Sequence, residues 1–459
     1  MRMSKVGVMI GCPQDIGAGG LRRYFNILPY LSRYFIMDDV SLALVPTCNS
    51  LVYSIKSLVM SGHDIDQATS LVKSNLLKSG EKCILSLEVL DRLLSYAQTI
   101  TEREFRVNSV IKKRVLGFSP IRMQYLSLVD AHGLDICRRF IESLAASSVF
   151  AYSLLESYDH VLALRLLGRE LGLVRSGIML QSEPYLHIRD LLTESPSGFI
   201  SSLYFNRAVA SLYGSLIQDR LVRLLLSVSS APFAISGIHK IANRYDCSMG
   251  VLSPSNAFDG KITHFRNTKS KEPIALFFTR LSPSKGLYEV PYIWQSVNKL
   301  NPVAKLWVVG SFENEIYRRV FSKLVKDLSI RNIEYLGYLS GDTLWKVVSK
   351  AKVLIYPSHR DSFSLAVLES LALGLAVVAY RIPAIESVYC GLETVSTVGE
   401  GDMKAMAMRT AELLNMSDDS FAELQEDEKT KKFLELHSSW ENVAKAEYNC
   451  LRCLLRPAG

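Results

Sequence analysis

The stretch SHRDSFSLAVLESLALGLAVVAY, residues 358–380, predicts a loop, a helix, a glycine and a buried strand in succession. The helix is expected to begin near residues 362–364 and to end at Gly374, because glycine commonly follows the last residue of a helix. At helical spacing, Glu369 then shares one face with Leu365 and other apolar residues. Burying a carboxylate without donors is costly, so Glu369 requires hydrogen-bond donors from the protein or from a ligand such as a ribose diol.

The second half of the chain alternates short apolar runs with amphipathic stretches. We expect strands at 274–279, 305–310 and 352–358, each followed by a helical pattern. Continuous apolar strands between helices are typical of a parallel sheet that is covered on both faces. The first half opens in the same way, with expected strands at 5–11 and 40–46. The sequence therefore predicts an α/β protein with two doubly wound, Rossmann-like domains.

The stretch RNTKSKEP, residues 266–273, is polar and charged and contains no large apolar residue. Such a composition is typical of a connection between domains. We therefore expect a first domain over residues 1–266, a linker over 267–273 and a second domain over 274–436. The first domain includes a mostly helical stretch, about residues 51–150, that the strand pattern does not explain.

The composition indicates a globular chain with buried cores, since 48% of its 459 residues are apolar and 21% are charged. No run reaches the roughly 18 apolar residues of a membrane span. The apolar run near the N-terminus lacks the cleavage pattern of a signal peptide. The eight cysteines are scattered along the chain, which favours reduced thiols over a disulfide framework. We therefore expect a cytoplasmic protein.

The net charge of +8 lies entirely in the first part of the chain. Residues 271–459 hold 23 of the 53 Lys and Arg and 23 of the 45 Asp and Glu, so residues 1–270 hold 30 basic and 22 acidic residues. This asymmetry suggests an anionic partner for the first domain, such as a membrane surface or a phosphorylated substrate. A basic surface that serves only solubility explains the charge equally well. The scattered positions argue against a nucleic acid as the partner.

Two cations follow the expected strand 274–279, in the segment TRLSPSKGL. In a doubly wound sheet, Arg280 and Lys285 would lie beyond the carboxyl ends of the strands, where such sheets bind ligands. A diphosphate suits them, since Arg offers a bidentate fork and Lys a point charge. Taken alone, the two residues are more typical of a solvated loop than of a ligand site. Taken together with Glu369, they favour a ligand site.

Three other patterns are better explained without a redox cofactor or a metal. The loop Gly17–Gly20 resembles the start of a dinucleotide fingerprint, but Arg22 stands where its third glycine belongs. Asp64 and Asp66 form a D-x-D pattern that helix capping explains. The C-x2-C pattern in Cys450–Cys453 lacks a second pair of zinc ligands nearby. We expect neither a metal nor a cofactor.

Taken together, these stretches resemble the retaining family-four glycosyltransferases, or glycosyl transferases group 1, which have the GT-B fold. TRLSPSKGL is similar to the family's G-R-L-x-x-x-K-G segment, and residues 361–380 are similar to its segment with the E-x7-E motif. LSPSNAFD (252–259) resembles the segment that closes the first domain, and SSWENVAKAEY (438–448) resembles a C-terminal helix. The resemblance implies two Rossmann-like domains that face each other across a cleft, with a helix over 437–459 that packs back on the first domain.

The resemblance also implies a role for each matching residue of the second domain. The implied donor-binding residues are Arg280, Lys285, Ser364, Leu365 and Glu369. Glu369 would bind the nucleotide ribose, the two cations would bind the diphosphate, and the two residues at the helix start would offer backbone N–H groups to phosphate. Asp361, as a catalytic residue, would contact the hydroxyls of the donor sugar.

In the first domain, the resemblance implies that Gly19 and Gly20 face the donor. The family often presents a histidine in the part of this domain that aligns with IMLQSEPYLH, and this chain lacks it at the early position. Glu183 is the predicted catalytic substitute, with Gln181 and His187 as alternatives.

The function implied is transfer of a hexose-type sugar from a nucleotide-diphosphate sugar to a glycan or lipid-linked acceptor, with retention, in the cytoplasm or at its membrane surface. This chain departs from the family where Asp361 replaces a Glu, where Ser362 and Ser364 replace glycines, and where Ala376 replaces a proline. These departures leave two alternatives open. One is a catalytically inactive GT-B module that binds a nucleotide or a glycan, and the other is a nucleotide-sugar epimerase of the same fold.

Overall fold

The chain forms two compact units, which are described separately. The computed structural model describes residues 5–10, 19–45, 48–60, 62–79, 87–111, 136, 148–154, 175–181, 223, 231–235, 237, 250–267, 271–313 and 315–455. Of these residues, the first unit takes those up to Ser255 and those from Val443 onward. The second unit takes those from Asn256 to Asn442.

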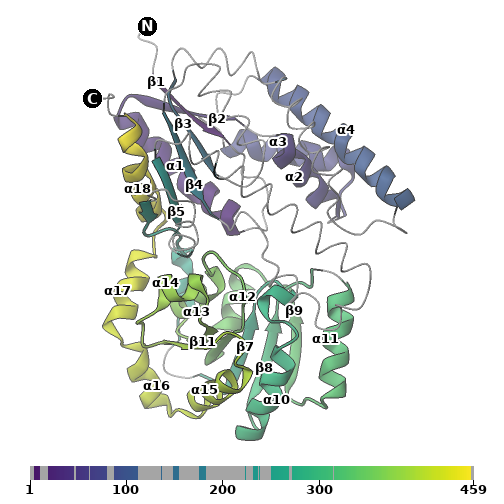
Figure 1. The fold of residues 1–459 in the computed structure, drawn as a ribbon, viewed down its shortest axis with the longest axis vertical. Helices are drawn as coiled ribbons and strands as arrows, with labels where there is room; N and C mark the ends of the chain where they lie inside the picture. Colours follow the sequence, from purple (N-terminus) through teal and green to yellow (C-terminus); the bar gives the residue numbers. More distant parts are fainter. Residues whose placement is uncertain are drawn as a thin grey trace. The chain divides into compact units, whose positions relative to one another are not determined.

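The first unit is built on a six-stranded parallel sheet (Figure 1). Its strands are β1 (Lys5–Ile10), β2 (Val40–Val45), β3 (Ser148–Leu154), β4 (Ser176–Leu180), β5 (Ala231–Ile235) and β6 (Gly250–Leu252). Their order is β2-β1-β3-β4-β5-β6, and each neighbouring pair is parallel. The strands expected at 5–11 and 40–46 correspond to β1 and β2, so the prediction of a parallel α/β sheet is confirmed here.

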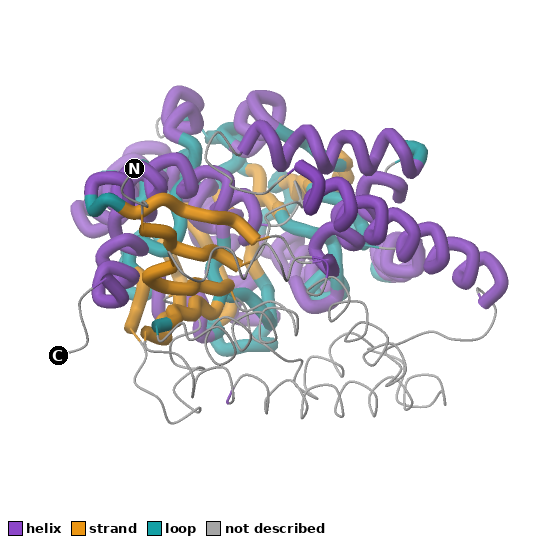
Figure 2. The backbone as a smooth tube through the Cα atoms, turned by 90° about the horizontal axis from the view of Figure 1, so that it is seen from above, coloured by secondary structure: helices purple, strands orange, loops and turns teal. Residues whose placement is uncertain are grey.

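The helices ahead of β3 are α1 (Gly19–Met37), α2 (Cys48–Met60), α3 (Ile65–Ser79) and α4 (Leu87–Ile111). The last three lie side by side, as Figures 1 and 2 show, and they correspond to the first part of the helical stretch predicted over about residues 51–150. The carboxylate of Asp64 accepts a hydrogen bond of 2.8 Å from the backbone N–H of Gln67 at the start of α3. This bond confirms that the D-x-D pattern caps a helix.

The C-terminal helix α18 (Trp440–Leu451) is joined to α1 by a buried ion pair within the first unit. Glu447 pairs with Arg23, and their side chains are 0% and 1% exposed. Tyr152 on β3 donates its hydroxyl to the same carboxylate. Arg23 also donates from Nε to the carbonyl oxygen of Ser255, at 2.5 Å. The end of the chain is therefore fixed to α1 and β3 through charges that are shielded from water.

The second unit is built on another six-stranded parallel sheet (Figure 1). Its strands are β7 (Ile274–Phe278), β8 (Lys305–Val309), β9 (Ile333–Gly337), β10 (Val353–Tyr356), β11 (Ala376–Tyr380) and β12 (Val395–Val398). Their order is β12-β11-β10-β7-β8-β9. Counted from β7, this is the strand order of a Rossmann fold, in which the direction of winding reverses between the first and the fourth strand. The prediction of a doubly wound sheet is confirmed.

The helices of this unit are α10 (Val290–Leu300), α11 (Glu315–Asp327), α12 (Gly341–Val348), α13 (Leu365–Ala372), α14 (Pro383–Tyr389), α15 (Met403–Asn415), α16 (Asp418–Gln425) and α17 (Glu428–Leu436). The helix predicted between residues 362–364 and Gly374 is α13. Ser364 caps its start, since its hydroxyl accepts a backbone N–H of the first turn. Gly374 adopts a φ of 81°, which L side chains rarely adopt, so a glycine ends the helix there.

The polar stretch 266–273 is part of the second unit. Arg266 and Lys271 donate to carbonyl oxygens at the end of α13, at 2.9 and 3.0 Å. The last carbonyls of a helix lack the donors that interior carbonyls have, and the two cations supply further donors to them. Burial, with a smaller effect of the Arg266 charge, lowers the pKa of Lys271 to about 7. The change of unit lies at Asn256, ahead of the linker predicted over 267–273.

Candidate functional site

Two loops of the second unit meet where the strand order reverses between β7 and β10. The loop after β7 contains the short turn η4 (Pro283–Lys285), and the loop after β10 leads to α13. Gly286 has a φ of 76°, and a Cβ there would lie 2.2 Å from the carbonyl oxygen of Pro357. The backbone N–H of His359 donates to the carbonyl oxygen of Ser284 at 3.0 Å. The loops therefore touch at the position where doubly wound sheets bind ligands.

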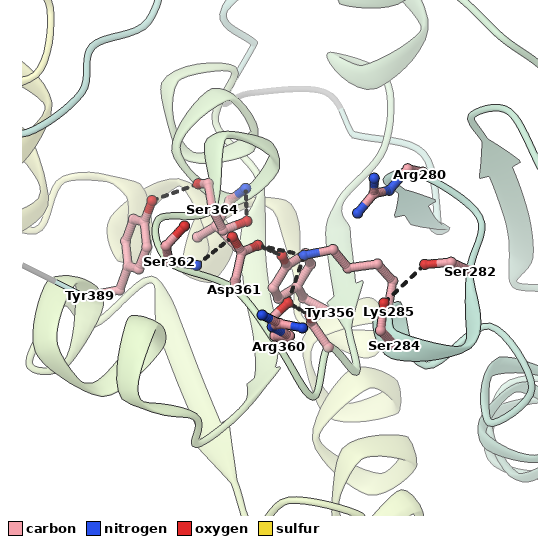
Figure 3. Close-up of polar contacts among 12 residues, drawn as sticks. Arg280, Ser282, Ser284, Lys285, Tyr356, Arg360, Asp361, Ser362, Ser364 and Tyr389 are labelled. Atoms are coloured by element: carbon pink, nitrogen blue, oxygen red, sulfur yellow. Dashed lines mark hydrogen bonds and ion pairs between the residues drawn. The ribbon is translucent and has the colours of Figure 1, made fainter. Parts of the chain in front are cut away.

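Lys285 and Asp361 form a partly buried ion pair at this contact (Figure 3). Nζ of Lys285 lies 2.9 Å from Oδ2 of Asp361 and 2.7 Å from the carbonyl oxygen of Arg360. Tyr356 donates its hydroxyl to Oδ2 of Asp361, and the backbone N–H of Ser362 donates to Oδ1 at 2.8 Å. Both carboxylate oxygens are therefore bonded within the protein.

These contacts fix the charge of each group. Burial alone would raise the pKa of Asp361, but the Lys285 ammonium and the Tyr356 hydroxyl outweigh it and hold that pKa below its ordinary value. Burial and the Asp361 charge raise the pKa of Tyr356 well above its ordinary value. Asp361 is therefore a carboxylate and Tyr356 a neutral donor near pH 7. An ammonium and a carboxylate side by side suit a ligand that carries both phosphate and hydroxyl groups.

Glu369 lies on a buried part of α13, as the helical spacing predicts, and is 5% exposed. Ser364 and Leu365, which were expected to face phosphate, stand at the N-terminal end of the same helix. Tyr389 donates its hydroxyl to the carbonyl oxygen of Ser364 at 2.6 Å. Burial raises the pKa of Tyr389, and the charges of Asp361 and Glu369 raise it further. Tyr389 therefore lies within electrostatic reach of both carboxylates of the E-x7-E-like motif.

Arg280 does not join this ion pair. Its side chain is 64% exposed, and Nε lies 3.0 Å from Oε1 of Glu313 in the loop after β8. Figure 3 shows it apart from the contact between Lys285 and Asp361, with no interaction drawn to either residue. Of the two predicted diphosphate-binding cations, Lys285 therefore lies next to Asp361, whereas Arg280 is paired with Glu313.

The sequence interpretation missed His359, which lies between two carboxylates. Its Nδ1 is 2.8 Å from Glu400 and its Nε2 is 2.6 Å from Glu289, and its side chain is 7% exposed. Tyr380 donates its hydroxyl to the other oxygen of Glu289. The two partners are 70 positions before and 41 positions after His359 in the chain, so no local pattern joins the three residues.

The residues predicted in the first domain are placed less completely. Gly19 and Gly20 open α1. Gln181 directly follows β4 and is buried. Glu183 and His187 lie outside the described residues, so the catalytic role of Glu183 stays a prediction.

Among the described residues, no group of three or more His, Cys, Asp and Glu side chains could hold a metal ion. Cys450 and Cys453 are free thiols, and Sγ of Cys453 donates to the carbonyl oxygen of Cys450 at 3.0 Å. Within the same described ranges, no helix has the length and apolar character needed to cross a membrane.

Comparison with known proteins finds a family similarity in the second unit. Residues 260–432 match the family model described as Glycosyl transferases group 1. This segment is therefore the part of the chain that resembles group 1 glycosyltransferases. It includes Lys285, Asp361 and Glu369, and also His359 with its partners Glu289 and Glu400. The chain is also 27% identical over 191 residues to the uncharacterized glycosyltransferase MJ1607 of Methanocaldococcus jannaschii. That match covers 41% of this chain and 47% of its relative, so the chain spans about half the length of that protein.

Solved structures show that the fold around residues 260–432 is GT-B. Anabaena Alr3699/HepE in complex with UDP has a TM-score of 0.59 at 12% identity, over 98% of this chain and 100% of that chain. The sucrose-phosphate synthase of Thermosynechococcus elongatus has a TM-score of 0.58 at 13% identity, over 98% of this chain and 99% of that chain. The fold predicted from the sequence is therefore confirmed.

Proposed function

We propose that this protein is a retaining family-four glycosyltransferase that moves a hexose-type sugar from a nucleotide-diphosphate sugar to a glycan or lipid-linked acceptor. One observation carries the proposal: within the segment that resembles group 1 glycosyltransferases, Lys285 and Asp361 meet at the carboxyl ends of β7 and β10. Their charges suit the diphosphate and the sugar hydroxyls of such a donor. The UDP bound by the Anabaena relative supports a nucleotide as the ligand.

In this proposal the chain supplies charge and orientation. Lys285 offsets the negative charge that develops on the diphosphate as the sugar leaves, and Arg280 assists by exchanging Glu313 for phosphate. No metal is then required for that charge. Asp361 accepts hydrogen bonds from sugar hydroxyls, and Glu369 accepts them from the ribose. The acceptor hydroxyl attacks from the side of the departing diphosphate, which retains the anomeric configuration.

The first test is a thermal-shift panel of UDP-, GDP-, ADP- and TDP-sugars. A donor at about 100 times its Kd should stabilise the wild type by about 2.7 kcal/mol. Glu369→Ala should lose this stabilisation because the ribose loses its acceptor. Glu386→Ala is the matched control, since Glu386 is an exposed glutamate of the same domain. The anomeric configuration of a product formed from the stabilising donor, read by NMR, tests retention.

If no nucleotide sugar of the panel raises the unfolding temperature of the wild type, the donor site is contradicted. If the donor shifts the wild type but Glu369→Ala loses no more of that stabilisation than Glu386→Ala does, the ribose role of Glu369 is contradicted. Nucleotide binding by the wild type then still stands. These two results separate the site from the residue assigned to it.

A binding module without catalysis is the second candidate, because one observation favours it. Both oxygens of Asp361 are bonded to protein donors, which leaves that carboxylate less available to a sugar. Sugar transfer, or slow hydrolysis of the donor, would exclude a pure binding module. Change of the donor's own configuration in the absence of an acceptor would instead indicate an epimerase.

The acceptor is assigned by charge alone. The basic balance of residues 1–270 supports an anionic or lipid-linked acceptor at a membrane surface. In a sedimentation assay the protein should pellet with anionic liposomes at low salt and be released as salt screens the attraction. Equal binding to neutral and anionic liposomes would remove the support for a membrane partner.

A further inference from the structure

His359 connects the loops that follow four neighbouring strands of the second sheet. It follows β10, and its ring contacts Glu400 in the loop after β12 and Glu289, the N-cap residue of α10. Its backbone N–H donates to Ser284 in the loop after β7. Tyr380, at the end of β11, bonds to Glu289 and lies against the imidazole, with ring centroids 5.4 Å apart. One side chain thus links the carboxyl ends of β12, β11, β10 and β7.

The geometry requires a charged imidazole. A carboxylate only accepts hydrogen bonds, so a ring that faces one carboxylate at each nitrogen must donate from both, as only the imidazolium does. Burial alone would lower the pKa of His359, but the hydrogen bonds to Glu289 and Glu400 outweigh it and raise the pKa to about 9. Burial, Glu289 and the charge of Asp402 raise the pKa of Tyr380, so Tyr380 stays a neutral donor in this range.

The loop that His359 anchors also holds the ammonium of the site. Lys285 donates to the carbonyl oxygen of Arg360 at 2.7 Å and to Asp361 at 2.9 Å. Both partners follow His359 directly in the chain. We propose that His359 is a positioning residue, which holds the 357–361 loop through its two carboxylates so that Lys285 is kept in place for an anionic ligand. This inference rests on the proposed function, in which Lys285 binds a diphosphate.

Calorimetric titration with UDP, GDP and ADP tests the inference, on the full chain of the wild type and of His359→Gln from pH 7 to pH 10. At pH 7 the variant should bind the best probe about tenfold more weakly, the usual order for a residue that supports a ligand-binding group. Above pH 9 the wild type also loses its imidazolium, so the ratio of the two Kd values should approach one. Ionisation of the probe affects both proteins and cancels in this ratio.

Two further variants separate charge from packing. Glu400→Gln keeps the imidazole but removes one of the two carboxylates that raise its pKa, so the fall in affinity should move to a lower pH than in the wild type. Tyr380→Phe keeps both contacts of His359 and should bind the probe as the wild type does. Glu400→Gln also decides the matter if His359→Gln does not fold, since its shifted pH profile needs no substitution of the histidine.

The outcomes distinguish the inference from the function beneath it. If the wild type binds a probe and His359→Gln binds it equally well, His359 does not position the loop. A weaker affinity whose ratio to the wild type stays constant from pH 7 to pH 10 would show a packing role only, and would overturn the inference. If no probe binds the wild type at any pH, the proposed function fails, and the inference fails with it.

Discussion

The buried pair between Arg23 and Glu447 makes a quantitative prediction about the first unit. Glu447→Gln keeps an acceptor for Tyr152 but leaves the Arg23 guanidinium buried without a counter-charge. Breaking a buried ion pair from one side costs about 3–5 kcal/mol. At a denaturant slope of about 2 kcal/mol per molar urea, a loss of about 4 kcal/mol lowers the urea midpoint by roughly 2 M.

The assay separates the two units spectroscopically. All four tryptophans lie at or after residue 294, and three of them are in the second unit well before α18. In a Trp440→Phe background, fluorescence therefore reports the second unit, while far-ultraviolet circular dichroism reports both. Glu447→Gln should lower the midpoint of the dichroism transition that belongs to the first unit and leave the fluorescence midpoint unchanged.

A matched control and a double substitution complete the test. Lys73 and Asp91 form an ion pair of the same unit with side chains 38% and 51% exposed, so Asp91→Asn should cost less than about 1 kcal/mol. Arg23→Met combined with Glu447→Leu should be less destabilised than Glu447→Gln, because no unpaired charge stays buried. A Glu447→Gln midpoint no lower than that of Asp91→Asn would refute the reasoning, since α18 would then be held by apolar packing alone.

Three further predictions concern the second unit. Gly286→Ala should lower the free energy of unfolding by at least about 1–3 kcal/mol, and by more than Gly337→Ala does. Both glycines have φ near 75°, but only at Gly286 would a Cβ lie against a carbonyl oxygen. Urea unfolding followed by fluorescence compares the two variants. The pKa of His359 is raised to about 9, so its stabilisation is complete below pH 6.5 and lost as the pH rises through 9. Burial lowers the pKa of His437 to about 4, so its stabilisation is complete above pH 6.5 and lost as the pH falls through 4. The unfolding midpoint of the second unit should therefore be highest near pH 6.5, and His359→Gln should flatten only the alkaline side. Glu313→Gln should strengthen nucleoside-diphosphate binding in calorimetry, because it removes the ion pair that Glu313 forms with Arg280. An unchanged Kd would mean that Arg280 does not reach the ligand.

The sequence was sufficient for the features that depend on local periodicity. Apolar runs bounded by turns predicted the strands at 5–11, 40–46, 274–279, 305–310 and 352–358, because a buried parallel strand needs apolar side chains on both faces. Helical spacing placed Glu369 on a buried face of α13, and the serine and glycine at its ends predicted where the helix begins and ends. Each of these inferences used residues within one turn or one strand of each other.

The features that the sequence did not reveal depend on distant contacts. Lys285 and Asp361 are 76 positions apart, and nothing local indicates that they neutralise each other. The polar stretch at 266–273 resembles a linker because its charges suit solvent equally well, yet Lys271 is buried and donates to the carbonyl oxygens of Ser349 and Leu373. Charged residues are ambiguous in a sequence because their partner decides whether they face water or the interior.

The ion pair at the site also has a consequence for affinity. Lys285 is already bonded to Asp361 and to the carbonyl oxygen of Arg360, so an anionic ligand gains only the difference between its own bonds and those it replaces. The Asp361 carboxylate, if it loses its ammonium, keeps donors from Tyr356 and Ser362, and a ligand hydroxyl can take the vacated position. A ligand that carries phosphate and hydroxyl groups together therefore offsets both losses, whereas phosphate alone offsets only one. This difference favours a complete sugar nucleotide over the free diphosphate at the same two residues.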